Sequence, residues 1–104
     1  MADLTILQGQ NLPISIDATN FGAITALQVE LSINGNAEVK FKYPETEGYN
    51  LLIIDGNNYT AILTTEITNA MLGLYRLEIT AFNGDQEIAK PDKKDFLQVN
   101  QQSV

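Results

Sequence analysis

The feature of this sequence that most constrains its fold is a strict alternation of apolar and polar residues. Between Leu27 and Ile33 every second residue is aliphatic, and the residues between them are polar or charged. Asn34-Gly35 follows directly, and both residues of such a pair accept the positive φ angles of a two-residue hairpin turn. The alternation then resumes from Val39 to Tyr43. Because a period of two is typical of half-buried strands, this region is predicted to form a β-hairpin with one face against a core.

The same period recurs through most of the chain, between turns rich in Asn, Asp and Gly. Seven or eight strands are expected, over residues 12–18, 27–33, 38–43, 59–63, 75–81, 87–90 and 96–100, with a further candidate at 3–7. An additional short apolar run occupies residues 51–54. Strands that are not separated by long helices favour an all-β sandwich or barrel over a parallel α/β sheet. The chain has 104 residues and no repeat or linker, so residues 1–104 are expected to form a single domain.

One segment departs from the period of two. Ile67, Ala70 and Met71 recur at helical spacing, Thr64 precedes them as a potential N-cap, and Gly73 supplies a stop. A short helical turn is therefore predicted near residues 65–72, between two strands.

Two residue types that commonly serve catalysis and metal binding are absent from the chain, and their absence disfavours several kinds of catalytic and metal site. The chain has no His and no Cys, which removes the commonest general base, the commonest zinc ligand and every His-activated nucleophile. Thirteen acidic and six basic residues give a formal net charge of −7, which disfavours nucleic acid and anionic membranes as partners. No apolar run approaches the roughly 20 residues that span a bilayer, and the start lacks a signal-peptide pattern. The chain is expected not to be an enzyme, to bind no cofactor, and to fold in the cytoplasm of the cell that makes it.

Acidic residues at turns and in loops are the remaining candidates for chemistry. Asp55 to Asn58 and Asn83 to Asp85 supply two or three oxygen ligands each, whereas Ca²⁺ takes six to eight. Glu45 and Glu47, together with Asp55 and Glu66, are candidates for the paired carboxylates of glycoside hydrolysis, but such pairs need a deep cleft that a sandwich of this size is not expected to have. Turn geometry and solvation account for these residues, so neither a metal site nor a catalytic site is predicted.

Loop aromatics and terminal segments are the candidate contact residues. Phe21 and Tyr49 lie in loops beside glycines, where an exposed ring can bind carbohydrate, whereas Tyr43 and Tyr59 fit the inward alternation of strands. Apolar side chains also occupy the two terminal segments that are candidates for sheet edges, namely Leu4, Ile6, Phe96 and Val99. Each terminal segment either completes the sheet of its own domain or adds a strand to a neighbouring subunit.

The segment from Met71 to Ile79 resembles the E–F corner of immunoglobulin-like domains. In that corner a short helical turn and a glycine precede a tyrosine whose hydroxyl bonds back to the backbone. Gly73 and Tyr75 hold these two positions, and Leu77 stands where antibody-type domains have a cysteine. The resemblance implies an immunoglobulin-like antiparallel β-sandwich in which Gly73 and Tyr75 form a structural tyrosine corner.

A second resemblance covers most of the chain. The opening from Leu7 to Leu12 and the later Leu63 to Glu66 with Gly73-Leu74-Tyr75 are similar to small immunoglobulin-like domains of phage tails, in particular the N-terminal domain of the upper baseplate protein family. Members of that family usually continue into a longer C-terminal region, whereas this chain stops at Val104, so a bridging role within a baseplate is not implied. The resemblance implies a non-catalytic structural or decoration protein of the virion that contacts other virion proteins or further copies of itself. The alternative is a module that binds carbohydrate or a cell-surface ligand.

Overall fold

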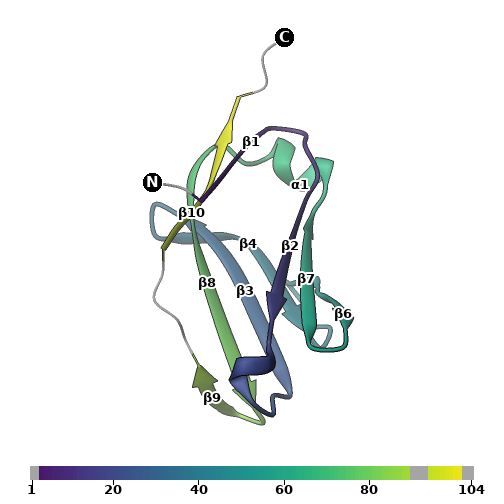
Figure 1. Ribbon diagram of the computed structural model, residues 1–104. Coiled ribbons are helices and arrows are strands. Elements are labelled where there is room, and N and C mark those ends of the chain that lie inside the picture. Colours follow the sequence, from purple (N-terminus) through teal and green to yellow (C-terminus); the bar gives the residue numbers. More distant parts are fainter. Residues whose placement is uncertain (1–2, 90–93, 102–104) are drawn as a thin grey trace.

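The computed structural model of the chain describes residues 3–89 and 94–101, which form two β-sheets that enclose an apolar core (Figure 1). Sheet A has seven strands, which are β1 (Leu4–Leu7), β3 (Ala26–Ile33), β4 (Asn36–Tyr43), β5 (Asn50–Leu51), β8 (Gly73–Asn83), β9 (Gln86–Ala89) and β10 (Lys94–Asn100). Sheet B has three strands, which are β2 (Leu12–Asp17), β6 (Ile53–Asp55) and β7 (Asn58–Leu63). The 3₁₀ helix η1 (Thr19–Phe21) joins β2 to β3, and the helix α1 (Thr65–Asn69) joins β7 to β8. The predicted all-β sandwich with a short helix in the 65–72 region is confirmed.

The strand order places distant segments side by side. Sheet A has the order β1-β10-β8-β3-β4-β5, and β9 pairs with the C-terminal end of β8. Sheet B has the order β2-β7-β6. The pairs are antiparallel except β1 with β10 and β4 with β5, which are parallel and lie at the two edges of sheet A. The division of β2, β6 and β7 from β3, β8 and β10 corresponds to that of strands B, D and E from C, F and G in immunoglobulin sandwiches.

The apolar run at residues 51–54 is shared between the two sheets. Leu51 belongs to β5 in sheet A and Ile53 belongs to β6 in sheet B, with Leu52 between them only 2% exposed. Because the chain crosses from one sheet to the other at this point, Leu52 enters the core while Leu51 and Ile53 are 51% and 54% exposed.

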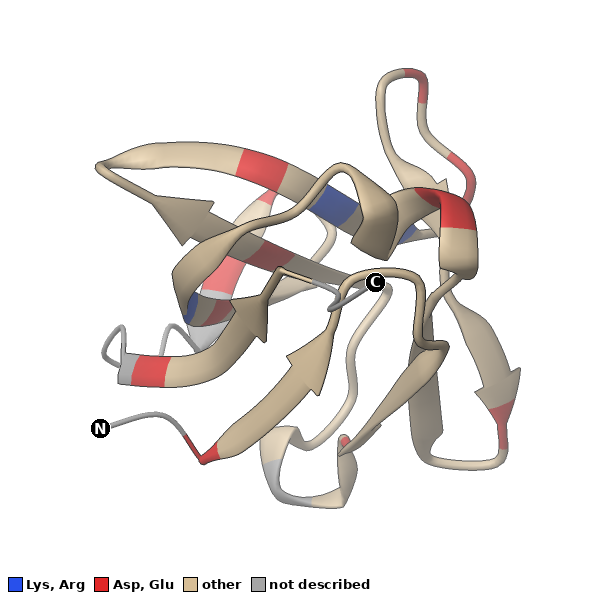
Figure 2. Cartoon of the chain, turned by 90° about the horizontal axis from the view of Figure 1, so that it is seen from above, with Lys and Arg blue, Asp and Glu red and all other residues tan. Residues whose placement is uncertain are grey.

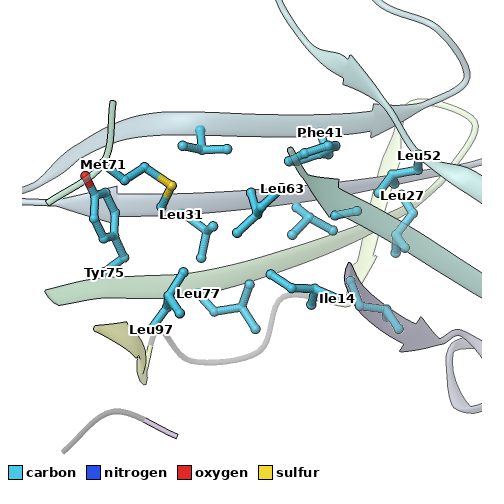
Figure 3. Close-up of a cluster of buried hydrophobic side chains, with 14 of the residues drawn as sticks. Ile14, Leu27, Leu31, Phe41, Leu52, Leu63, Met71, Tyr75, Leu77 and Leu97 are labelled. Carbon is cyan, nitrogen blue, oxygen red and sulfur yellow. The ribbon is translucent and has the colours of Figure 1, made fainter. Parts of the chain in front are cut away.

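The core is built from the inward residues of both sheets. Leu27 and Leu31 of β3 point towards the other sheet, where Ile14 and Leu63 meet them (Figure 3). Each aliphatic side chain buried in this way stabilises the fold by about 1.5–3 kcal/mol. Tyr43, which the alternation places in the core, is 38% exposed and is the last residue of β4. Its ring meets that of Tyr59 edge to face, with ring centroids 6.0 Å apart.

Candidate interaction site

The two terminal strands have different positions in sheet A. β10 lies between β1 and β8, so it is an interior strand, and only β1 is an edge. Val99 pairs with Ile6 on one side and with Gly73 on the other, and its side chain is 0% exposed. The prediction of Val99 as a contact residue is therefore wrong, and Val99 is a core residue. Phe96 is half-buried and packs against the core at a register shift between Asp95 and Leu97.

The outer edge of β1 is partly closed by Gln10. The Gln8 N–H donates to the Asn100 carbonyl at 2.9 Å, so the backbone groups of Gln8 point towards β10. Because the backbone groups of successive strand residues point to opposite sides, those of Thr5 and Leu7 point away from β10. The Leu7 N–H donates to Gln10 Oε1 at 2.7 Å, and the Leu7 carbonyl accepts from the Gln10 N–H at 3.2 Å. Thr5 likewise directs its N–H and carbonyl away from β10, and no strand of the described residues lies on that side.

The side chains of β1 make this edge apolar. Leu4 and Leu7 are 39% and 41% exposed, whereas Ile6 is half-buried and packs against the core. Natural proteins protect exposed edges with charged residues, proline or bulges. The edge strand β2 of sheet B contains Pro13, but the stretch from Leu4 to Leu7 contains neither a charge nor a proline. The β1 edge, defined as Leu4–Leu7, is thus an uncharged strand that can accept another strand.

A hydrogen-bond network holds the start of the chain onto α1. The Thr68 side chain is fully buried, and its hydroxyl accepts from the Gly9 N–H at 3.0 Å and donates to the Gln10 carbonyl at 2.9 Å. The Gln8 side-chain amide donates to the Met71 carbonyl at 2.9 Å. These bonds join the β1–β2 connection to the corner before β8, and so they position the β1 edge.

The corner after α1 contains Gly73 and Tyr75 in the arrangement that a tyrosine corner requires. The Tyr75 hydroxyl accepts a hydrogen bond from the Leu72 N–H at 3.1 Å. Burial raises the pKa of Tyr75 above its ordinary value, and the hydrogen bond from Leu72 opposes this rise. Gly73 has a φ of +113°, and a Cβ atom there would lie 2.8 Å from Ile33 Cδ1, so both the backbone angle and the space favour glycine.

The two loop aromatics predicted as a carbohydrate platform are both engaged within the domain. Phe21 belongs to η1 and packs against the core. The ammonium groups of Lys40 and Lys42 lie over the ring of Tyr49, at 5.0 Å and 5.5 Å from its centroid. Because a sugar would have to compete with these contacts, the arrangement gives carbohydrate binding no specific support.

Charged residues are unevenly distributed along the described part of the fold (Figure 2). Lys40 and Lys42 lie on β4 and Arg76 lies on β8, whereas acidic residues occur on many elements and connections. Arg76 Nε lies 3.3 Å from Asp95 Oδ1 in a solvent-exposed pair, which contributes at most about 1 kcal/mol. Among the described residues, no group of three or more acidic side chains is arranged to hold a metal ion. In the same part of the chain, no helix has the length and apolarity needed to cross a membrane.

Two hollows on the surface of the described residues were not predicted from the sequence. One of about 420 Å³ lies beside the β3–β4 turn and is lined by Ser32, Leu74 and Arg76 among others. The other, of about 220 Å³, lies between β4 and α1. Their lining residues come from separate segments, so no local pattern in the sequence could have indicated them.

No family model matches this chain, and neither a curated protein nor a solved structure matches it.

Proposed function

We propose that this chain is a non-catalytic structural or decoration protein of a phage or phage-like particle, which acts through protein–protein contacts at the β1 edge. The observation that carries the contact is the exposed, uncharged strand from Leu4 to Leu7, on which the backbone of Thr5 is open to a further strand. The sequence resemblance to small domains of phage tails supports the setting in a virion. The absence of His and Cys from the sequence supports a role without catalysis.

Strand addition suits this edge for two physical reasons. Backbone hydrogen bonds to Thr5 provide affinity without requiring a particular sequence in the partner, and neighbouring side chains provide specificity. Leu4 and Leu7 would bury apolar surface at about 25 cal/mol per Å² on contact. A copy of the same chain meets both conditions, and closed symmetric assemblies are the usual outcome of such self-contacts.

The test is the solution mass, measured by light scattering coupled to size exclusion over a range of concentrations. The unmodified chain is expected to form a discrete trimer, hexamer or larger ring, and Leu4→Lys is expected to shift it towards monomer by placing a charge on the edge. Ile53→Lys makes the same substitution at an exposed position of sheet B and is expected to leave the mass unchanged. A monomer at every concentration would argue against self-assembly. An assembly that survives Leu4→Lys would exclude the β1 edge as its contact.

A further inference from the structure

The hollow between β4 and α1 combines an apolar interior with polar groups at its rim. Its volume is about 220 Å³, and its lining consists of Glu38, Val39, Asn50, Ile67, Ala70 and Met71. Val39 and Met71 are core residues, so the interior is apolar. Glu38 and Asn50 supply a carboxylate and a side-chain amide. Small-molecule pockets usually measure about 300–1,000 Å³, so this hollow is of a size for one side chain.

The hollow lies beside an open stretch of β4. The short strand β5 pairs only with Phe41 and Lys42, so the stretch from Asn36 to Lys40 has no strand on that side within the part of the chain that the structure describes. Asn50 Nδ2 donates to the Lys40 carbonyl at 3.3 Å, which leaves Asn50 Oδ1 as an acceptor. On this side of β4, Asn50 therefore occupies the Lys40 carbonyl, and no strand of the described residues lies beside the stretch before Lys40.

A register shift next to the hollow sets Glu38 apart from its neighbours. Val39 pairs with Leu31 and Ala37 pairs with Ser32, so Glu38 is the extra residue of a bulge and has no partner across the strands. Bulges commonly redirect a side chain in this way. Glu38 lines the hollow together with Met71, which lies between α1 and β8 in the chain. Lys40 and Lys42 lie against Tyr49, and Glu38 forms no ion pair with another described residue.

We propose that this hollow receives a lysine or arginine side chain from a partner protein, whose extended segment pairs with β4 between Asn36 and Lys40. The alkyl part of such a side chain packs on apolar surface while its charged end stays at the rim. There the Glu38 carboxylate and Asn50 Oδ1 accept charge-assisted hydrogen bonds. A net charge of −7 also attracts a basic segment. The inference rests on the proposed function in that both require a protein partner, but it uses a different edge of sheet A.

The test is an NMR titration of the isotope-labelled full chain with two synthetic peptides. The probe is the capped pentapeptide Val-Thr-Lys-Thr-Val, and its match has norleucine in place of lysine. The lysine peptide is expected to cause saturable chemical-shift changes at Asn36–Lys40 and at the Met71 methyl group. The affinity of the norleucine peptide is expected to be roughly tenfold lower, because that peptide lacks the charged hydrogen bond.

Three variants sharpen this test. Glu38→Gln is expected to lower the affinity for the lysine peptide by roughly tenfold, so that the lysine and norleucine peptides bind equally well. Glu47→Gln removes the same charge from the β4–β5 loop and is expected to leave the affinity unchanged. Ala70→Leu, at an exposed position on the rim, is expected to fill the hollow and to lower the affinity for both peptides.

The proposal would be overturned by equal affinities for the two peptides, by shifts confined to other surfaces, or by no shifts up to about 10 mM peptide, a concentration that detects even very weak binding. The titration is repeated in the Leu4→Lys background. That repeat separates the two proposals, because peptide binding at β4 does not depend on assembly through β1, and loss of either behaviour leaves the other measurable.

Discussion

The Tyr75 hydroxyl accepts a hydrogen bond from the Leu72 backbone N–H, three residues earlier in the chain, across 3.1 Å. This bond closes the corner between α1 and β8 and satisfies an N–H group in a partly buried position. The ring itself is a buried part of the core next to Met71 (Figure 3). The same side chain thus fills the core and fixes the backbone that leads into the longest strand of sheet A.

Tyr75→Phe keeps the ring in the core but removes the acceptor for the Leu72 N–H. The free energy of unfolding, measured by urea denaturation, is expected to fall by about 1–2 kcal/mol, the usual cost of leaving such a group without a partner. Tyr43→Phe removes a hydroxyl from an exposed ring and is expected to change stability by less than about 0.5 kcal/mol. Equal effects of the two substitutions would contradict the structural role of the bond.

Stability is expected to decline at alkaline pH, in part through Tyr75. Burial raises the pKa of Tyr75 in the folded chain, so this hydroxyl stays protonated at pH values where the unfolded chain already loses its proton. The stabilisation is fully present below the unfolded pKa of about 10 and is lost as pH rises through the folded pKa. Unfolding free energies between pH 9 and pH 12 are expected to fall more steeply for the unmodified chain than for Tyr75→Phe. Identical slopes would show that Tyr75 makes no contribution.

Gly73→Ala tests the close approach of β8 to β3. The new Cβ atom would meet Ile33 Cδ1 at 2.8 Å, and φ at this position is +113°. A loss of about 2–3 kcal/mol in unfolding free energy is expected from overpacking and backbone strain together.

Ile33→Val removes Cδ1 and supplies the control for that clash. The double variant is expected to recover about 1 kcal/mol relative to the sum of the single variants. Gly84→Ala, where φ is +64° and the space is open, is expected to show the cost of backbone strain alone, about 1 kcal/mol. Strict additivity of Gly73→Ala and Ile33→Val would mean that the clash is relieved in some other way.

Thr68→Val tests the attachment of the chain start to α1. Valine has a similar shape but leaves the Gly9 N–H without its acceptor, so a loss of about 1–3 kcal/mol is expected. Hydrogen exchange at the Gly9 amide is expected to become faster. Thr68→Ser retains the hydroxyl and is expected to preserve the slow exchange at Gly9. If Thr68→Ser and Thr68→Val accelerate exchange to the same extent, packing by the Thr68 methyl group is the cause instead.

Strands and helix ends could be predicted from the sequence because their signals are local. The alternation between Leu27 and Ile33, followed by Asn34-Gly35, predicted a hairpin, and β3 and β4 pair around that turn. Thr64, predicted as an N-cap, accepts a hydrogen bond from the Ile67 N–H at 3.4 Å. In both cases the residues that interact are close in the chain, so the period and the capping chemistry are visible in the sequence.

Edges and hollows could not be predicted in this way. The alternation of residues 96–100 is the same whether the strand lies at an edge or in the interior of a sheet. Val99 is buried because β1 covers the free side of β10, a pairing between the two ends of the chain. Glu38, Asn50 and Met71 likewise meet around one hollow only because α1 packs near β4.

The sequence by itself thus determined the all-β class, the hairpin at Asn34-Gly35 and the absence of His and Cys side chains, since these depend on local periodicity and composition. Only the tertiary structure decided that β1 is an edge, that β10 is interior and that Glu38 lies beside an apolar hollow. The physical reason is that strand pairing joins segments far apart in the chain, and a side chain's exposure depends on which segment lies next to it.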